Sequence, residues 1–306
     1  MNTRDLRYVL AVAHHGHFGR AAAACGVSQP TLSVQVRKLE TSLGLTLFDR
    51  TSRGVAPTPG CTQILPHARA AVAEADAITA LARARQDPLS GRFRLGIIPT
   101  LAPFLLPLVF APLREALPAL EIEPWEDQTD ALLARLRTHE LDAALIATIP
   151  GGPDLTSTPL FDEPFLAALP PDHPLVEKLV VTEAELARDI LVMSDGHCLR
   201  DQALAACGAS GAMEGALGGA LGGALRAASL STLLNMVAAG YGTTLVPALA
   251  SGAAQDAGIV LRPLTVPVGR TVRIAWRANL ARPAAVHAVG AVLIKRLAGF
   301  AESARR

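Results

Sequence analysis

The first sixty residues show short helical patterns that end at glycines. Apolar residues recur at helical spacing in residues 3–14, and small residues fill 18–24. Ser28 is a favoured N-cap residue, and the helical pattern that it opens runs to Gly44. The pattern therefore predicts three short helices, each closed by a glycine or a turn.

Extended and linking segments follow. Residues 47–50 and 55–58 have the composition of two short strands around a turn, which predicts a hairpin. Residues 59–86 form an Ala-rich stretch with an apolar stripe, which predicts a long helix suited to dimerisation. Residues 87–91 combine Pro and Gly, and we expect a hinge there.

Beyond the hinge, strand and helix patterns alternate. The expected strands are 92–98, 121–125, 143–149, 165–169, 190–193, 243–246, 260–264 and 271–276. The expected helices are 104–117, 129–138, 182–187, 200–206, 229–239 and 284–301. The alternation predicts an α/β fold, and a length of about 215 residues favours two lobes. Residues 215–225 repeat Gly-Ala-Leu-Gly, which is typical of a flexible loop or a poorly specified helix.

Composition narrows the class of protein. Half of the 306 residues are hydrophobic, which excludes wholesale disorder. Four cysteines are too few for a secreted disulfide framework. We find no signal peptide and no apolar stretch long enough to span a bilayer, so we expect a cytoplasmic protein without a membrane partner.

The charges are unevenly distributed. The chain carries a net charge of +1, but residues 1–60 hold seven basic and three acidic side chains. The remaining residues are therefore mildly acidic. A basic N-terminal part on an acidic body indicates that nucleic acid, if bound, is bound by the N-terminal part.

The third predicted helix has the composition of a DNA-reading helix. Hydroxyls and amides near its start suit base edges, and cations further along suit phosphates. The candidate DNA contacts are Ser28, Gln29, Pro30, Thr31, Ser33, Gln35, Arg37 and Lys38 on this helix, with Arg50 and Arg53 on the hairpin. The alternative is a polar helix face that is simply solvated.

Several runs in this part resemble LysR-type transcriptional regulators. They are residues 20–22 (RAA), 27–33 (VSQPTLS), 37–40 (RKLE), 43–44 (LG) and 47–50 (LFDR). The resemblance implies a winged helix-turn-helix domain, a linker helix and a two-lobed α/β effector domain like that of periplasmic binding proteins. It also implies double-stranded DNA as a partner, a homodimer through the linker helix, a homotetramer, and contact with RNA polymerase during activation.

The resemblance also gives the expected boundaries. They are 1–58 for the DNA-binding domain, 59–87 for the linker helix and 88–306 for the effector domain, with lobe I at about 91–163 and 267–306 and lobe II at about 164–266.

A cysteine motif stands out in the second lobe. Only a thiolate attacks an oxidant, and His197 and Arg200 place cationic or donor groups beside Cys198. If a helix starts near residue 199, its N-terminus also favours an anion at the sulfur. We therefore expect a lowered pKa for Cys198. Asp201 would anchor Arg200 or accept a proton.

Cys207 lies nine residues beyond Cys198. In a continuous helix the two would be roughly 13 Å apart along the axis, whereas a disulfide requires Cα atoms about 4.4–6.8 Å apart. The pair is either unconnected, as two small hydrophobic residues in an Ala-rich helix, or a switch in which oxidation forces refolding. No metal or other cofactor is expected, and Cys25 and Cys61 are interpreted as structural.

The motif around Cys198 is similar to that of hydrogen-peroxide sensors within the LysR-type family. The matching runs are residues 196–203 (GHCLRDQA) with Cys207, 98–100 (IPT), 105–107 (LLP), 159–164 (PLFDEP), 235–240 (NMVAAG) and 245–249 (LVPAL). The similarity implies that hydrogen peroxide oxidises Cys198 to a sulfenic acid, which Cys207 condenses to a disulfide.

The same similarity assigns further roles. It implies that Thr100, His197 and Asp201 hold or polarise the peroxide, that Thr129 supplies another hydroxyl, and that Arg270 is a basic residue near the pocket. The Gly-Ala-Leu-Gly repeat departs from the family and adjoins the segment that would refold.

Three functions are therefore weighed. The favoured one is a peroxide-sensing transcription regulator that alters promoter binding of oxidative-stress genes. The second is a LysR-type regulator gated by an organic ligand between the lobes, with incidental cysteines. The third, a thiol peroxidase, is disfavoured by the DNA-reading domain, so we do not expect an enzyme.

Overall fold

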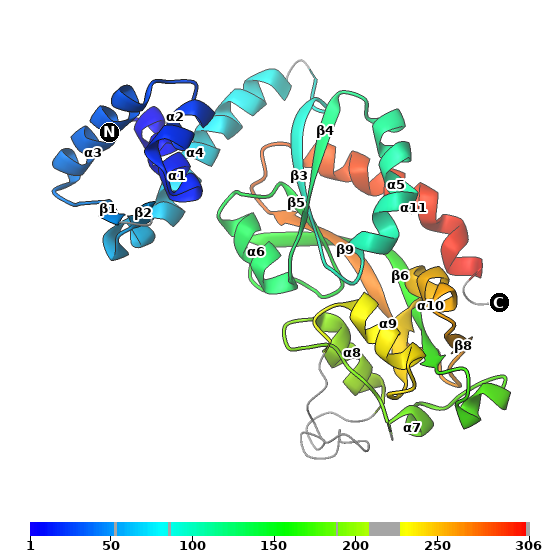
Figure 1. Ribbon diagram of the computed structural model, residues 1–306. Helices are drawn as coiled ribbons and strands as arrows, with labels where there is room; N and C mark the ends of the chain where they lie inside the picture. The colour runs from blue at the N-terminus through cyan, green and yellow to red at the C-terminus, as the bar shows by residue number, and fades with distance from the viewer. Residues whose placement is uncertain (52–53, 85–86, 188, 208–226, 304–306) are drawn as a thin grey trace. The chain divides into compact units, whose positions relative to one another are not determined.

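The chain folds into two compact units, shown as a computed structural model in Figure 1. The structure describes residues 1–51, 54–84, 87–187, 189–207 and 227–303. One unit comprises residues 1–88 with 137–140, and the other comprises 89–136 with 141–306. Arg53 and the Gly-Ala-Leu-Gly repeat lie outside the described residues. Within the described residues, none of the helices has the length and apolar character needed to cross a membrane.

The N-terminal unit has the predicted helices and hairpin. Its elements are α1 (Thr3–His15), α2 (Phe18–Ala24), α3 (Gln29–Leu43), β1 (Phe48–Thr51), β2 (Gly54–Pro57) and α4 (Pro59–Ala84). Ser28 caps α3 by accepting a hydrogen bond from the Thr31 amide at 3.3 Å. Gly44 ends α3 with a φ of 65°, which a residue with a Cβ adopts only under strain. The predicted caps are confirmed.

The helices of this unit enclose one apolar core. It includes Leu6 and Val9 of α1, Leu32 of α3, Leu47 before the hairpin and Leu65 of α4. β1 and β2 pair antiparallel, with Phe48 opposite Pro57. The first turns of α4 therefore belong to the same folded body as the helix-turn-helix.

The C-terminal unit is built on a seven-stranded mixed sheet. Its strands are β3 (Gly91–Ile97), β4 (Leu120–Glu126), β5 (Ala143–Ile146), β6 (Leu155–Leu169), β7 (Thr244–Pro247), β8 (Val260–Arg262) and β9 (Gly269–Arg277). The order is β4-β3-β5-β9-β6-β7, and β8 also pairs with β6. β3 runs parallel to β4 and β5, whereas β9 runs antiparallel to β5 and β6.

Helices cover this sheet. They are α5 (Ala102–Ala116), α6 (Thr129–Arg137), α7 (Glu183–Leu186), α8 (Cys198–Ala206), α9 (Leu230–Ala238), α10 (Ser251–Asp256) and α11 (Pro283–Ser303), with two short 3₁₀ helices, η1 (Pro174–Glu177) and η2 (Ala248–Ala250). The predicted α/β fold is confirmed.

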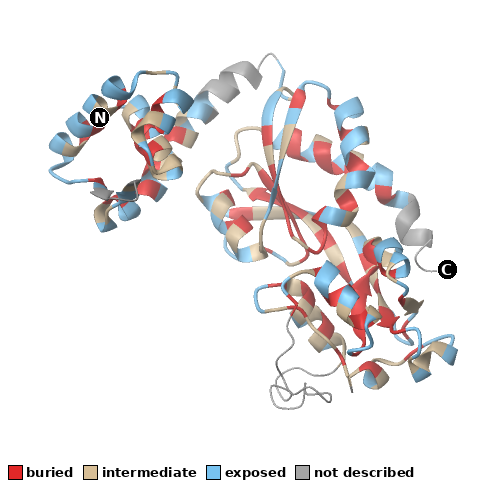
Figure 2. Ribbon diagram, viewed as in Figure 1, coloured by how far each residue is buried: buried red, intermediate tan, exposed pale blue. Residues whose placement is uncertain are grey.

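Strand β6 joins two apolar cores. Residues 155–164 of β6 pair with β9, and residues 165–169 pair with β7 and β8. One core lies around β3, β5, α5 and α11, and the other lies around α8, α9 and β7. Figure 2 shows the buried residues of both cores along the strands. The C-terminal unit is thus two-lobed, with β6 and β9 passing between the lobes.

Several details differ from the sequence prediction. β6 begins ten residues before the predicted strand at 165–169, because Pro159, Asp162, Glu163 and Pro164 interrupt the apolar pattern. The predicted strand at 190–193 is wrong: Ile190 and Met193 form only isolated bridges. α10 and both 3₁₀ helices are too short to carry a clear periodic signal.

Candidate functional site

Cys198 is the first residue of α8, and His197 is its N-cap residue. The helix therefore begins two residues before the predicted start. Cys207 is the C-cap residue of the same helix, and both thiols are free. This continuous helix, predicted over 200–206, separates the two cysteines.

A small pocket collects four of the predicted sensor residues. Thr100 comes from the segment after β3, Thr129 from the first turn of α6, and His197 and Cys198 from the start of α8. The residues lining it are Ile98, Pro99, Thr100, Gln128, Thr129, Gly196, His197 and Cys198. Segments that follow parallel strands meet at the carboxyl edge of a sheet, where α/β proteins place their ligands.

Gln128 fixes the turn before Cys198, although no role was predicted for it. Its amide nitrogen lies 3.4 Å from His197 Nε2 and 3.5 Å from the Asp195 carbonyl oxygen, to which it donates. Gly196 turns the chain with a φ of 89°, and a Cβ there would lie 2.4 Å from Gln128 Oε1. The positive φ favours glycine at residue 196, and a Cβ there would displace the end of the Gln128 side chain from these contacts.

We predict that Gly196→Ala lowers stability more than Gly240→Ala does. Both glycines have a similar positive φ, so both substitutions cost about 1–2 kcal/mol of backbone strain. A Cβ on Gly240 meets nothing within 4 Å, whereas one on Gly196 collides with Gln128. Urea unfolding measures both, and equal losses would show that Gln128 does not restrain this turn.

A buried ion pair lies beside the pocket and contacts Thr100. Glu163 and Arg270 lie opposite each other on β6 and β9, and neither side chain is exposed to solvent. Arg270 Nε donates to Glu163 Oε2 at 2.8 Å, while Nη1 donates to Thr100 Oγ1 at 2.7 Å. Glu163 Oε1 also accepts the Leu249 amide at 2.8 Å. Arg270 thus fixes the Thr100 hydroxyl, a contact that was not predicted, although Arg270 was expected near the pocket.

Burial raises the pKa of the Cys198 thiol above its ordinary value, so the predicted net lowering is wrong. Opposing effects come from the positive charge of Arg270, from the Thr129 hydroxyl and from the backbone N–H groups of Leu199 and Cys198. The predicted effect of the helix N-terminus is confirmed in direction. Desolvation outweighs it because the half-buried thiol is removed from much of the solvent.

The Thr129 hydroxyl has hydrogen-bonding capacity left for a ligand. Its oxygen is buried, and no atom of the described chain meets it with ordinary hydrogen-bond geometry. It nevertheless lies close enough to the Cys198 sulfur to favour the thiolate. A buried hydroxyl without a full partner beside a nucleophile suits a small polar molecule.

His197 does not act as a cation here. Burial lowers the pKa of its imidazole, so the ring is neutral at pH 7. Of the two roles expected for His197, cation or hydrogen-bond donor, only the donor role is open to the neutral ring. A neutral imidazole has one donor and one acceptor nitrogen, so His197 lines the pocket as a hydrogen-bonding group.

Arg200 and Asp201 lie outside the pocket lining. Arg200 Nη1 donates to Asp201 Oδ1 at 3.2 Å, and its Nε lies 3.3 Å from Asp195 Oδ1. The predicted anchoring of Arg200 by Asp201 is confirmed. The Asp201 side chain is 79 % exposed, so its orientation does not bring it to the sulfur in this dithiol form.

Helix α8 is attached to the first lobe by Gln202. Its Nε2 donates to the Ala147 carbonyl oxygen, just beyond β5, at 2.9 Å. Cys207, at the far end, packs against the second core. Burial and the negative charge of Glu183 raise the pKa of Cys207 to about 11, so this thiol rests protonated.

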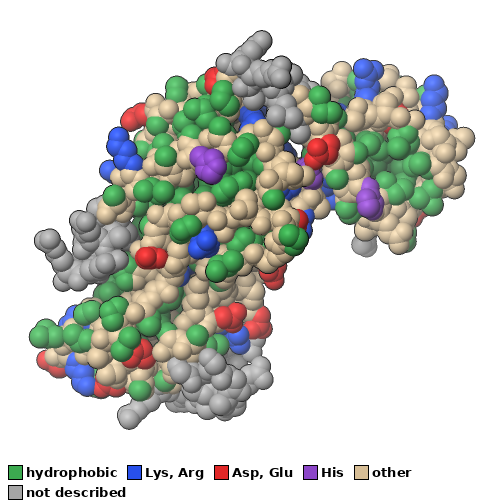
Figure 3. Space-filling view, turned by 180° about the vertical axis from the view of Figure 1, so that it is seen from behind, with side chains coloured by type: hydrophobic (Ala, Val, Ile, Leu, Met, Phe, Trp, Pro, Cys, Tyr) green, Lys and Arg blue, Asp and Glu red, His purple; other side chains and the backbone are tan. Residues whose placement is uncertain are grey.

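The candidate DNA contacts lie on one exposed part of the N-terminal unit. Ser28, Gln29, Pro30, Thr31, Arg37 and Lys38 are exposed, and Ser33 and Gln35 are half-buried. Arg50 lies on β1, whereas Arg53 is outside the described residues. Figure 3 shows blue Lys and Arg side chains standing out from this unit. The apolar residues Leu32, Val36 and Leu39 face its core instead.

Two family models match the chain. The model for the bacterial regulatory helix-turn-helix protein of the lysR family matches residues 3–61. The model for the LysR substrate binding domain matches residues 86–298.

Individual relatives agree with these matches. The DNA-binding transcriptional dual regulator OxyR of Escherichia coli is 42% identical over 280 residues, 90% of each chain. A probable hydrogen peroxide-inducible genes activator of Mycobacterium avium is 46% identical over 243 residues, 79% of this chain and 76% of the relative.

Solved structures give the same result. A full-length OxyR variant from Pseudomonas aeruginosa superposes with a TM-score of 0.78 at 36% identity, covering 96% of this chain and 94% of its own. A hydrogen-peroxide-bound OxyR mutant from Corynebacterium glutamicum has a TM-score of 0.67 at 31% identity, covering 99% and 95%.

Proposed function

The chain belongs to the LysR family of bacterial transcriptional regulators, and from this premise we propose that it is a DNA-binding regulator that responds to hydrogen peroxide through Cys198. Relatives named as hydrogen peroxide-inducible genes activators support the proposal. The observation that carries it is the position of Cys198 in a pocket with Thr100, Thr129 and His197.

The proposed reaction begins at the Cys198 sulfur. The thiolate attacks one peroxide oxygen, an S–O bond forms, the O–O bond breaks, and the leaving hydroxide takes a proton to become water. The Thr100 hydroxyl accepts a hydrogen bond from Arg270, so its own proton is free to be donated to a peroxide oxygen. Arg270 thereby transmits positive charge to the site where negative charge develops.

The second step requires helix α8 to open. The Cys207 thiol loses its proton and attacks the sulfenic sulfur, an S–S bond forms, the S–O bond breaks, and the leaving hydroxide takes a proton to become water. The intervening helix keeps the two cysteines roughly 13 Å apart along its axis. We infer that unwinding of α8, with loss of the Gln202 bond to Ala147, is the conformational signal.

The remaining assignments complete the proposal. The DNA-binding domain is residues 1–58, the dimerising linker helix is 59–87 and the redox-sensing domain is 88–306. Within the redox-sensing domain, lobe I is about 91–163 together with 267–306, and lobe II is about 164–266. We propose a homodimer through α4, a homotetramer on DNA, and contact with RNA polymerase when it activates. Arg200 and Asp201 act in the state in which α8 has refolded. We expect no multiple-turnover peroxidase activity.

Footprinting on a target promoter tests the function. Adding hydrogen peroxide to the reduced protein is expected to change the protected region, and a reductant is expected to restore it. A footprint that ignores peroxide but shifts with an organic metabolite would favour ligand gating instead. Multiple turnover of peroxide with a thiol donor would favour a peroxidase.

We predict that Lys38→Ala weakens DNA binding by a similar factor for every sequence. Lys38 is exposed on α3, where it can neutralise one phosphate. Its loss should reduce the slope of log affinity against log salt by about 0.9. Fluorescence anisotropy at several salt concentrations measures the slope, with Arg114→Ala on α5 as the matched control. An unchanged slope for Lys38→Ala would place this helix face away from DNA.

A further inference from the structure

The C-terminal unit contains a second cavity, which the proposed sensing reaction does not use. Its volume is about 610 Å³, within the usual range of about 300–1,000 Å³ for small-molecule sites. Two segments line it, residues 162–166 of β6 and residues 263–271 leading into β9. Its lining shares no residue with the pocket around Cys198.

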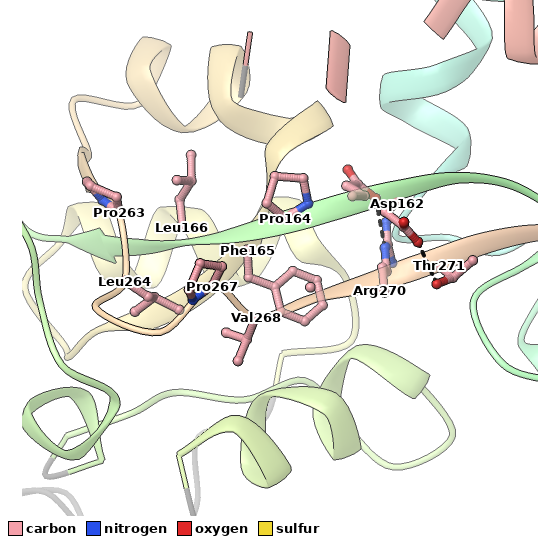
Figure 4. Close-up of a pocket in the computed structure, with 12 residues that line it drawn as sticks. Asp162, Pro164, Phe165, Leu166, Pro263, Leu264, Pro267, Val268, Arg270 and Thr271 are labelled. Atoms are coloured by element: carbon pink, nitrogen blue, oxygen red, sulfur yellow. Dashed lines mark hydrogen bonds and ion pairs between the residues drawn. The ribbon is translucent and has the colours of Figure 1, made fainter. Parts of the chain in front are cut away.

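Most of the cavity lining is apolar. The apolar side chains are Pro164, Phe165, Leu166, Pro263, Leu264, Pro267 and Val268. Figure 4 shows Pro263 and Leu264 at one end, with Pro267, Phe165 and Val268 between that end and the polar one. Such a lining favours an occupant with a flat or branched hydrocarbon body.

The other end of the cavity carries a negative charge. Asp162, Arg270 and Thr271 lie together there in Figure 4. The charge of Arg270 is compensated by Glu163 at 2.8 Å, whereas Asp162 is exposed and accepts a hydrogen bond from the neutral Thr271 hydroxyl at 2.7 Å. The group left to attract a charged ligand is therefore the Asp162 carboxylate.

We propose that this cavity is a second ligand site, for a small molecule with an apolar body and a cationic amine head. The body would lie against Phe165, Leu264 and Val268, and the ammonium group would lie at Asp162. An anionic ligand of the same shape would be repelled by that carboxylate.

The cavity is also placed to influence the sensor. Glu163 and Arg270 form part of its wall, and Arg270 holds the Thr100 hydroxyl at 2.7 Å. A ligand that shifts this pair changes both the Thr100 position and the positive charge beside Cys198. This coupling rests on the proposed function, whereas the binding itself does not.

Binding is tested with the full-length, reduced protein carrying ¹³C-labelled Leu and Val methyl groups. Three probes of one shape are titrated: tryptamine, the neutral tryptophol, and the anionic indole-3-propionate. We expect methyl shifts at Leu264 and Val268, with tryptamine bound about fivefold more tightly than tryptophol and the propionate weakest. Shifts confined to other methyl groups, or equal affinities for the three probes, would overturn the site.

Two variants sharpen the test. Asp162→Asn should remove the preference for tryptamine, while the matched control Asp172→Asn, an exposed aspartate outside the lining, should keep it. Val268→Trp should fill the cavity and abolish binding of all three probes, with urea unfolding to verify its fold. Retained preference in Asp162→Asn would contradict the assignment of the head group.

Coupling is measured separately as the rate of Cys198 alkylation with and without saturating tryptamine. A rate changed about twofold or more is expected, and an unchanged rate would overturn the coupling. Because no peroxide is used, failure of the binding test is distinguishable from failure of peroxide sensing.

Discussion

Replacing Cys198 by serine is expected to abolish the transcriptional response to hydrogen peroxide. A serine hydroxyl at the start of α8 keeps the size and hydrogen bonding of the site but cannot form a sulfenic acid or a disulfide. A promoter–reporter assay with added peroxide measures the response, which should fall to the level without peroxide. DNA binding by the reduced variant should remain, because Cys198 lies in the C-terminal unit.

Two other cysteine variants serve as comparisons. Cys25→Ser is expected to keep the response, since Cys25 is the C-cap residue of α2 in the N-terminal unit. Cys207→Ser should still form the sulfenic acid but should not reach the disulfide. A full response in the Cys198→Ser variant would mean that another group senses the signal.

The second large effect is expected from the buried Glu163–Arg270 pair next to the pocket. Substituting Arg270 and substituting Glu163 should shift the pKa of Cys198 in opposite directions. Arg270→Gln removes the charge that favours the Cys198 thiolate, so the pKa of Cys198 rises further and its alkylation slows by about tenfold at pH 7. Glu163→Gln leaves Arg270 uncompensated, which lowers the pKa of Cys198 and speeds alkylation. Rates measured from pH 6 to pH 9 report both shifts.

The pH profile itself follows from burial. Because the pKa of Cys198 is raised, the thiolate is the minor species at neutral pH, and its population grows about tenfold per pH unit until the pKa is reached. The wild-type rate should therefore still be rising at pH 8. An alkylation rate that is flat above pH 6 would show that the pKa of Cys198 is lowered rather than raised.

The loss of unfolding free energy on substitution should distinguish the buried Glu163–Arg270 pair from a surface ion pair. Breaking the Glu163–Arg270 pair by one substitution leaves a buried charge alone and should cost about 3–5 kcal/mol of unfolding free energy. Arg92→Gln is the matched control, because the Arg92–Glu123 pair at 3.4 Å is largely exposed. That variant should cost less than about 1 kcal/mol and leave Cys198 reactivity unchanged. Equal changes in the two variants would contradict the role of Arg270.

The sequence predicted best what local spacing determines. The caps at Ser28 and Gly44 depend on neighbouring residues, and the structure has both. The predicted helix at 200–206 is also present as α8, although α8 begins two residues earlier. The helix between Cys198 and Cys207 follows from the same kind of pattern. These features can be predicted from neighbouring residues, without knowing which distant residues meet in the fold.

The electrostatics of the pocket could not be derived in that way. Glu163 and Arg270 are 107 positions apart and meet only because β6 pairs with β9. Burial of Cys198 and His197 depends on the whole fold. It lowers the pKa of His197, and it reversed the direction that neighbouring charges predicted for the pKa of Cys198. Gln128 lacked any local signal for its contact with His197, 69 positions away.

Peptide mass mapping after a stoichiometric dose of hydrogen peroxide tests the central claim most directly. The account predicts a Cys198–Cys207 disulfide in the wild type, and a sulfenic acid on Cys198 alone when Cys207 is replaced by serine. Persistence of both free thiols, or first oxidation at Cys207, Cys25 or Cys61, would contradict it.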